Sequence, residues 1–372
     1  MKILAVDVGT GTQDILLFDT RSAVENAVKL VMPSPTLLVG RRVREATRRR
    51  ASILFEGPMM GGGPSAWALR DHAAAGLTVY ATPDAALTLD DDLERVRALG
   101  ITLVSEDESR ALRVETRVQS GDLRLQAIHR ALAAFDVPPR YDALAVAVFD
   151  HGNAPPGVSD RKFRFDYLRR TLQAGGWLTA FAHARQAIPK EMTRLASVER
   201  ATPDDIPLLL MDTGPAAILG ALEDRTLAPD GGRSLIVANV GNFHCLAFHL
   251  VDRAVAGLFE HHTGEVSRES MERMLVRLGE GTLTDEEVFG SMGHGALVLE
   301  PGAVPPSVLG VLGPQRNLLR GSRLNPRFAV PHGDQMLAGC YGLLRGAAAR
   351  LPELADELSA ALDSTDVRQP EW

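Results

Sequence analysis

One strand pattern occurs twice in this chain of 372 residues: an apolar strand, a turn that begins Asp-Val-Gly or Asn-Val-Gly, and a second apolar strand. The first copy spans residues 3–18, with its turn at 7–12. The second spans residues 235–250, with its turn at 239–242, and a third strand near 254–259 would complete a meander. Two copies of one pattern, one in each half, predict an internal duplication of a single fold.

Short apolar strands alternate with helical patterns between and after the two copies, which predicts an α/β fold. The length fits two domains. A short stretch with Pro and Asp near 201–205 places the expected boundary after residue 204, giving an N-terminal lobe with insertions (1–204) and a C-terminal lobe (205–372). The other expected elements are strands at 77–81, 101–104 and 143–149, and helices at 65–75, 123–134, 163–172, 192–200, 335–345 and 352–362.

Composition excludes several classes of protein. No run of 18 apolar residues is present, and Asp7 interrupts the short apolar start, so we expect neither a membrane span nor a signal peptide and infer the cytoplasm. The formal net charge is −7, and the one basic cluster, at 41–50, is either a solvated helix face or an anion contact. No nucleic-acid partner is therefore expected. Two cysteines, Cys245 and Cys340, are too few for an iron–sulfur cluster, which usually takes about four thiolates.

The turn of the first copy carries the strongest chemical signal. Gly9 and Gly11 can adopt backbone angles closed to other residues, and the amides and hydroxyls around Thr10 and Thr12 suit phosphate oxygens. Asp7 at its entrance is a candidate Mg²⁺ ligand, through water. The alternative is an ordinary hairpin turn that needs glycine. A dinucleotide fingerprint is excluded because a strand follows the turn, and no Lys follows as in a Walker-type loop.

Two of these segments resemble phosphate motifs of the actin/hexokinase/Hsp70 superfamily: residues 7–14 resemble the first motif and 239–242 the second. Residues 211–220 resemble the Asp-bearing, alanine-rich helix of carbohydrate kinases, whose general base falls on Asp212. This resemblance implies two RNase H-like lobes with mixed sheets, an interlobe nucleotide cleft, and ATP with Mg²⁺ as cofactors. The chain departs from the superfamily at Asn239, where Asp is usual, and by one extra residue between Asp212 and Gly220.

The whole chain also resembles a bacterial and archaeal family often labelled pyruvate formate-lyase activating protein. The resemblance is carried by residues 60–64, 150–152, 159–161 and 332–334. The label conflicts with the cysteine count, because a radical activase needs a cysteine-held cluster.

Each candidate site residue has a structural alternative. Asp212 follows an apolar strand and precedes Pro215, so it is either a general base or a helix cap. Adjacent residues such as His261 and His262 do not share a face, which argues against a metal site there. The expected catalytic residues are Asp7, also the metal ligand, and Asp212; the nucleotide would contact Gly9, Thr10, Gly11, Thr12, Asn239, Gly241, Asn242, Gly333 and Asp334; the substrate would contact Asp150, His151, Asp160, Arg161, Gly62 and Gly63.

Three functions stay open at this point. The first is a kinase that phosphorylates a small hydroxyl compound. The second is an ATP-driven switch or accessory ATPase that acts on a protein partner, which Asn239 favours because it weakens the case for fast hydrolysis. The third is a binding protein without catalysis. Residue patterns leave the substrate, the partner and the oligomeric state open.

Overall fold

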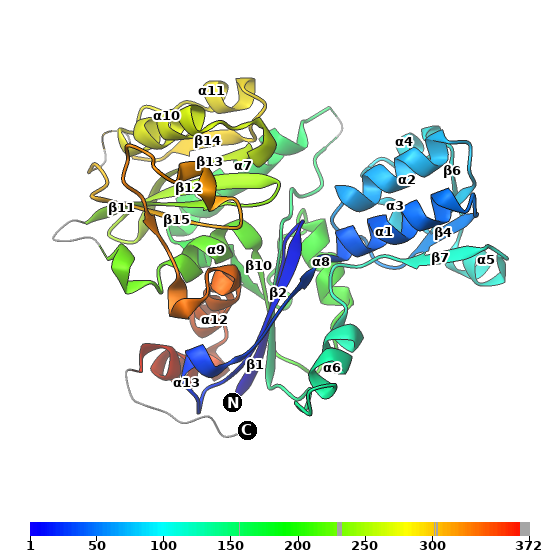
Figure 1. Ribbon diagram of the computed structural model, residues 1–372, viewed down its shortest axis with the longest axis horizontal. Coiled ribbons are helices and arrows are strands. Elements are labelled where there is room, and N and C mark those ends of the chain that lie inside the picture. The colour runs from blue at the N-terminus through cyan, green and yellow to red at the C-terminus, as the bar shows by residue number, and fades with distance from the viewer. Residues whose placement is uncertain (156, 229–232, 301, 303, 365–372) are drawn as a thin grey trace.

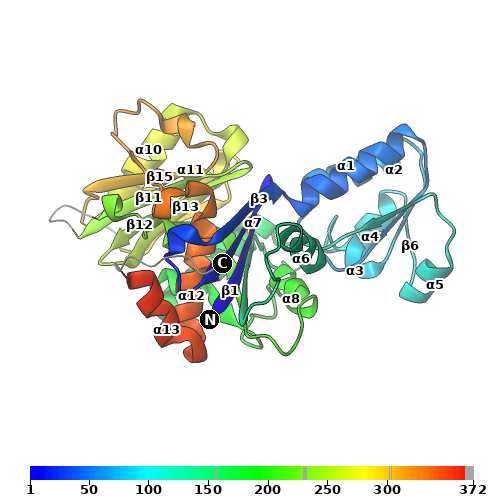
Figure 2. The ribbon, with the colours of Figure 1, turned by 60° about the horizontal axis from the view of Figure 1, so that its bottom comes forward.

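The computed structural model describes residues 1–155, 157–228, 233–300, 302 and 304–364. It contains two six-stranded sheets with helices packed between and around them, and a third, smaller unit that projects to one side (Figures 1 and 2).

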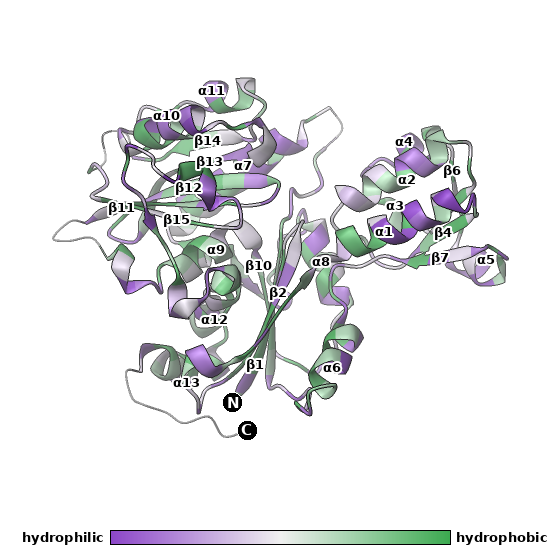
Figure 3. Cartoon of the chain, viewed as in Figure 1, coloured by the Kyte–Doolittle hydropathy of each residue, from purple (hydrophilic) through white to green (hydrophobic). Residues whose placement is uncertain are grey.

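The first sheet has the order β3-β2-β1-β8-β10-β9. Its first three strands form an antiparallel meander, β8 and β10 run parallel to β1, and β9 pairs antiparallel at the edge. The strands next to the centre are wholly buried, as expected for runs without a polar face, and Figure 3 shows them in the hydrophobic colour. The strand bounds are β1 (Lys2–Val8), β2 (Thr12–Asp19), β3 (Val28–Pro33), β8 (Ala143–Val148), β9 (Ala182–Ala184) and β10 (Leu208–Asp212).

The second sheet repeats this plan with the order β14-β13-β12-β11-β15-β16. Strand β11 pairs antiparallel with β12 and parallel with β15, as β1 does with β2 and β8. Both sheets therefore contain the same RNase H-like core, which confirms the predicted duplication and the two-lobed fold of actin-like ATPases. The bounds are β11 (Ser234–Val240), β12 (His244–Val251), β13 (Ala254–His262), β14 (Gly295–Val298), β15 (Val308–Leu312) and β16 (Arg327–Phe328).

The projecting unit is a parallel four-stranded sheet, β6-β5-β4-β7, inserted between β3 and β8. It has a separate hydrophobic core, so we name it the inserted domain, residues 35–119. Only two of its short strands were expected from the sequence. Its elements are α1 (Pro35–Arg48), β4 (Ile53–Glu56), α2 (Pro64–Ala74), β5 (Val79–Ala81), α3 (Pro83–Ala86), α4 (Leu93–Ala98), β6 (Ile101–Leu103), α5 (Glu106–Ala111) and β7 (Thr116–Gln119).

Two helices cross closely between the main sheets. Helices α9 (Thr213–Ala221) and α12 (Ala338–Arg350) meet at glycines: a Cβ added to Gly220 would lie 1.7 Å from the Ala338 carbonyl oxygen, and one on Gly342 would lie 1.9 Å from that of Ala216. The small residues therefore let the two backbones touch. The remaining helices are α6 (Leu125–Ala133), α7 (Asp160–Gly175), α8 (Thr193–Arg200), α10 (Arg268–Gly279), α11 (Asp285–Gly290) and α13 (Pro352–Asp363).

The expected domain boundary after residue 204 stays a prediction. Strand β10, which follows that point, pairs with β8 in the first sheet, and α12 packs against β1, β8 and β10. The C-terminal part of the chain thus returns to the first lobe. Within the described residues, no helix is long and apolar enough to cross a membrane.

Replacing Gly342 with Ala is expected to lower the free energy of unfolding by about 1–3 kcal/mol, because the new methyl group meets the Ala216 carbonyl and overpacks the helix crossing. Urea denaturation followed by circular dichroism would measure this. The matched control is Gly290→Ala, near the end of α11, where a Cβ meets nothing within 4 Å. Equal stability of the two variants would contradict the close crossing.

Candidate functional site

The two predicted phosphate turns have the same local geometry. In the first, the Gly9 amide donates to the Thr12 carbonyl at 2.9 Å, and in the second the Gly241 amide donates to the His244 carbonyl at 2.9 Å. Each bond closes a tight turn between an inner strand, β1 or β11, and its antiparallel neighbour. The repeated strand pattern of the sequence therefore produces two matching loops, one from each lobe.

These loops face each other across the gap between the lobes. A Cβ added to Gly11 would lie 2.1 Å from the side-chain amide nitrogen of Asn242, so the two turns are in close contact there. A cavity of about 110 Å³ lies beside this contact, lined by residues of both lobes. Of the residues expected to bind nucleotide or metal, those lining it are Asp7, Gly9, Thr10, Gly11, Thr12, Asn239, Gly241 and Asn242.

The other two expected nucleotide contacts, Gly333 and Asp334, do not line the cavity. Asp334 accepts a hydrogen bond from the Met336 amide at 3.0 Å and caps the short 3₁₀ turn Gln335–Leu337. The side chains of Gln335 and Met336, immediately after it, do line the cavity.

Asp7 and Asp14 form a carboxylate pair at the cavity. They are directly opposite in the β1–β2 register, and the Thr213 hydroxyl donates to Asp7 Oδ1 at 2.6 Å. Burial raises the pKa of Asp7 to about 7, and burial together with the charge of Asp7 raises that of Asp14 to about 8. Asp14 Oδ1 is buried without a hydrogen-bond partner among the described residues. Two carboxylates with an unused oxygen fit a hard divalent cation.

Asp14 was not among the expected site residues. The signal was present, because a hairpin whose turn is centred between Gly9 and Thr12 pairs residue 7 with residue 14. Register, more than residue type, would have identified it.

Asp212 lies behind the cavity and is already fully engaged. Its Oδ2 accepts from Arg164 Nη1 at 2.6 Å, and its Oδ1 accepts from Arg164 Nη2 at 3.2 Å and from the Gly214 amide at 3.0 Å, which caps α9. Both oxygens of this carboxylate therefore already accept hydrogen bonds in the closed arrangement. Its role as a general base stays a prediction, and the capping alternative describes its contacts.

Arg164 joins carboxylates from both sheets. Besides Asp212 on β10, it binds Glu260 on β13, with Nη2 2.8 Å from Glu260 Oε2. The Arg164 side chain is only 1% exposed, and its guanidinium carbon lies 4.0 Å from the ring centroid of Phe149. Although burial opposes ionisation of Glu260, the charge of Arg164 keeps its pKa well below the ordinary value. This buried triad ties the lobes together at the edge of the cavity.

Three of the expected substrate residues, Asp150, Asp160 and Arg161, are held by separate local contacts. Asp150 is buried and accepts from the Gly152 amide at 2.9 Å and the Leu195 amide at 2.8 Å, so it holds its loop. Arg161 donates to the Gly293 carbonyl at 2.7 Å, and Asp160 is the first residue of α7. Their substrate roles stay predictions.

His151 and the glycines of the inserted domain lie next to residues that line the cavity. The His151 ring packs edge-on against Phe149, with centroids 4.8 Å apart. Gly62 and Gly63 immediately precede α2, and a Cβ added to Gly63 would lie 3.5 Å from the methyl group of Thr10 in the first turn.

The inserted domain also contacts the second turn. Trp67, on α2, packs against Phe243, with ring centroids 5.6 Å apart, while remaining 52% exposed. Phe243 lines the cavity. The start of α2 therefore lies beside the first glycine turn, and its Trp67 packs against Phe243 of the second.

Replacing Arg164 with Met is expected to lower the free energy of unfolding by about 3–5 kcal/mol, since it leaves two buried carboxylates without their cation. The control is Arg170→Met, which breaks a half-exposed pair with Glu191 and is expected to cost about 0–1 kcal/mol. Urea denaturation measures both. A loss below about 1 kcal/mol for Arg164→Met would show that the triad does not hold the lobes.

Comparison with solved structures finds matches over nearly the whole chain at low identity. The ethanolamine utilization protein EutJ from Carboxydothermus hydrogenoformans is 13% identical, covering 92% of this chain and 89% of its own, with a TM-score of 0.30. The ROK hexokinase from Thermus thermophilus is 13% identical, with coverages of 93% and 98% and a TM-score of 0.29. A Ppx/GppA family member from Aquifex aeolicus is 8% identical, with coverages of 96% and 91% and a TM-score of 0.28.

Sequence comparison gives a family and no individual relative. No curated protein matches the chain. The profile of the family described as "Putative pyruvate format-lyase activating enzyme (DUF1786)" matches residues 60–318. Because this match covers more than half of the chain, the protein belongs to the DUF1786 family.

Proposed function

We propose that this protein binds ATP between its lobes and cleaves or transfers the terminal phosphate. The observation that carries the proposal is the meeting of two matching glycine turns, one from each lobe, at a single cavity. Backbone amides of such turns bind phosphate oxygens, and the hydroxyls of Thr10 and Thr12 add further donors.

Asp7 and Asp14 are the residues that would hold Mg²⁺, because they pair across the hairpin and leave a buried oxygen unused. The ion supplies charge neutralisation on the phosphates. Thr213 orients Asp7, and close packing of Gly339 against Asp7, where a Cβ would lie 1.9 Å from Oδ2, fixes the carboxylate in place.

The lobes must open for nucleotide to enter. The cavity of about 110 Å³ is smaller than the roughly 300–1,000 Å³ of ligand pockets. Opening would separate Gly11 from Asn242 and would strain the buried contact between Arg164 and Glu260. Binding would therefore be coupled to lobe motion, which is how closing domains exclude water from phosphoryl transfer.

Transfer to a small hydroxyl compound is the finer form of the proposal. In that form Asp212 takes the hydroxyl proton, and Arg164 must first release at least one of its oxygens. Lobe opening provides such a rearrangement, because the same guanidinium also binds Glu260 of the other sheet.

A second candidate function is an ATP-dependent switch that acts on a protein partner. The observation in its favour is that α2 touches both turns, through Gly63 beside Thr10 and Trp67 beside Phe243. A change in the spacing of the turns would therefore move the inserted domain, which projects from the lobes (Figure 2).

The cysteines of this chain do not fit the radical-activating chemistry that the family description implies. Cys245 lies on β12 and Cys340 on α12, and both are fully buried. Two separated, buried thiols cannot ligate an iron–sulfur cluster that usually takes about four thiolates. We therefore derive no step through such a cluster.

The carboxylate pair gives the metal-free protein a distinctive pH dependence. Asp7 and Asp14 have pKa values raised from 3.8 to about 7 and about 8, so between about pH 4 and pH 8 the folded state binds more protons than the unfolded chain. These groups consequently stabilise the fold at low pH, and that contribution is lost as the pH rises through 8. The melting temperature of Asp14→Asn, relative to wild type, should increase from pH 5 to pH 8.

Thermal unfolding in the presence of a chelator measures this difference. Adding Mg²⁺ at pH 8 should stabilise wild type more than Asp14→Asn. The exposed Asp166→Asn, on α7, is the control and should follow wild type throughout. Parallel pH profiles for wild type and Asp14→Asn would contradict the shared carboxylate site.

Titration calorimetry with Mg-ATP tests the proposed function itself. We expect a dissociation constant between about 1 μM and 1 mM, the usual range for enzyme substrates. Asp7→Ala should weaken binding at least about 10-fold, through loss of the metal ligand. Asp19→Ala, at the far end of β2, should leave it unchanged.

If Mg-ATP produces no binding heat and no thermal shift, nucleotide binding is refuted. A non-catalytic binding protein is then the function that remains. If ATP binds, turnover that requires an added hydroxyl compound and is lost in Asp212→Asn supports the kinase. Slow turnover without an acceptor, together with a nucleotide-dependent change in Trp67 fluorescence that Trp67→Phe removes, supports the switch.

A further inference from the structure

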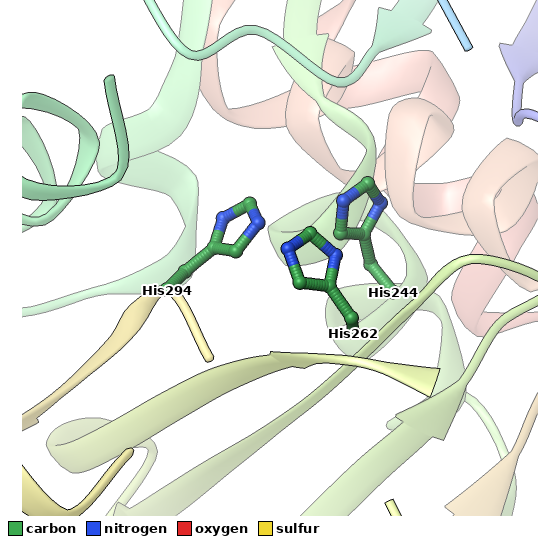
Figure 4. A group of neighbouring side chains, drawn as sticks. All are labelled: His244, His262 and His294. Atoms are coloured by element: carbon green, nitrogen blue, oxygen red, sulfur yellow. The ribbon is translucent and has the colours of Figure 1, made fainter. Parts of the chain in front are cut away.

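Three histidine side chains from separate parts of the second lobe converge at the end of the nucleotide cavity. His244 begins β12, His262 ends β13, and His294 precedes β14 (Figure 4). One ring nitrogen of each lies within 4.8 Å of those of the other two. The ring centroids are 5.2 Å apart for His244 and His262, 5.0 Å for His244 and His294, and 4.6 Å for His262 and His294.

Backbone pairing holds this arrangement in place. His244 and His262 are direct partners in the β12–β13 register, so their side chains lie on the same face of the sheet. The His294 amide donates to the Glu260 carbonyl at 2.9 Å, which fixes His294 beside the end of β13. The three ligands therefore stand on strand ends whose positions the sheet determines, a rigid support for a bound ion.

A carboxylate behind the cluster sets the orientation of one ring. His294 Nδ1 lies 2.5 Å from Glu260 Oε1, so Nε2 is the atom left to coordinate. Metal-binding histidines characteristically donate their second ring nitrogen to such a carboxylate.

A buried carboxylate lies beside the histidines. Glu260 Oε1 is 2.5 Å from His294 Nδ1, and the Arg164 guanidinium pairs with both Glu260 and Asp212. A dication placed at the histidines would thus have an anionic carboxylate next to it.

We propose that His244, His262 and His294 bind a first-row transition-metal dication such as Zn²⁺. Imidazole nitrogen selects this class, whereas Mg²⁺ requires oxygen ligands and belongs at Asp7 and Asp14. A Zn–N bond of about 2.0–2.1 Å places tetrahedral ligand nitrogens about 3.3 Å apart, so the present spacing closes by at most about 1.5 Å. The required shift is within the reach of side-chain rotation.

Three protein ligands leave a fourth position for water or a substrate oxygen, which is the arrangement of catalytic zinc sites. His244 lines the nucleotide cavity, so this position would face the same space as the two turns. A metal there lowers the pKa of its bound water toward 7 and supplies a nucleophile or an anchor for an anionic group. The metal site does not depend on whether the cavity binds ATP.

The alternative is a packed cluster of neutral rings without a metal. Phe149 stacks on His244 with centroids 4.4 Å apart and an interplanar angle of 8°, and stacking alone would explain the position of that ring. The two possibilities differ in whether the purified chain takes up a metal, so the test measures binding directly.

The experiment uses full-length, untagged protein stripped of metal with a chelator and titrated with Zn²⁺ by calorimetry and with Co²⁺ by visible absorption. We expect one metal per chain and the intense d–d bands of four-coordinate cobalt. His262→Ala and His294→Gln should each weaken binding at least about 100-fold. His261→Gln is the matched control, because His261 neighbours His262 but its ring faces Ser291, and it should bind like wild type.

Circular dichroism establishes that each variant folds, and His262→Gln, which keeps most of the side-chain volume, replaces any variant that does not. Absence of saturable Zn²⁺ or Co²⁺ binding in wild type would overturn the proposal. So would equal affinity in wild type, His262→Ala and His294→Gln, which would place the metal elsewhere. Loss of binding in the His261→Gln control alone would also contradict this set of ligands.

Discussion

The buried guanidinium of Arg164 is the contact on which the relation between the two lobes depends. It lies between Asp212 at the end of β10 and Glu260 near the end of β13. One side chain therefore forms an ion pair with a carboxylate of each sheet. A buried charge of this kind is strongly destabilising when its partners leave, because water cannot reach it to compensate. The closed arrangement of the lobes is therefore specific, and any open state must either rehydrate these groups or find them new partners.

The same triad connects the chemistry on its two sides. Asp212 caps α9, whose first residue, Thr213, orients Asp7 at the first glycine turn. Glu260 orients His294 in the histidine cluster. A rearrangement at Arg164 would thus reach the carboxylate pair and the histidines together. Helices α9 and α12 pack in direct backbone contact, so a shift of one helix must displace the other. Because Gly339 on α12 packs against Asp7, such a shift would also change the position of Asp7.

Local signals in the sequence were sufficient for the hairpins and the two-lobed fold, because each glycine turn and its two strands lie within about twenty residues. They placed Asp7 and the two turns at one cavity. They were insufficient for the inserted sheet, whose strands of three or four residues are too short to show a period. The ion pairs that Arg164, Glu260 and His294 form were also beyond reach, since the partners are 34 to 96 positions apart and no local pattern records such contacts.

The inserted domain has a mechanical consequence. It is attached to the first lobe at residues 33–35 and 119–125, and α2 rests against both turns at the attached end, while β6 and α5 lie at the far end (Figure 1). The inserted domain would therefore rotate about its attached end, beside the two turns, as a rigid body. A sub-ångström change in the spacing of the turns would become a sweep of several times that size at its tip. A displacement too small to change the structure of either lobe could thus change the position of a surface to which a second molecule binds.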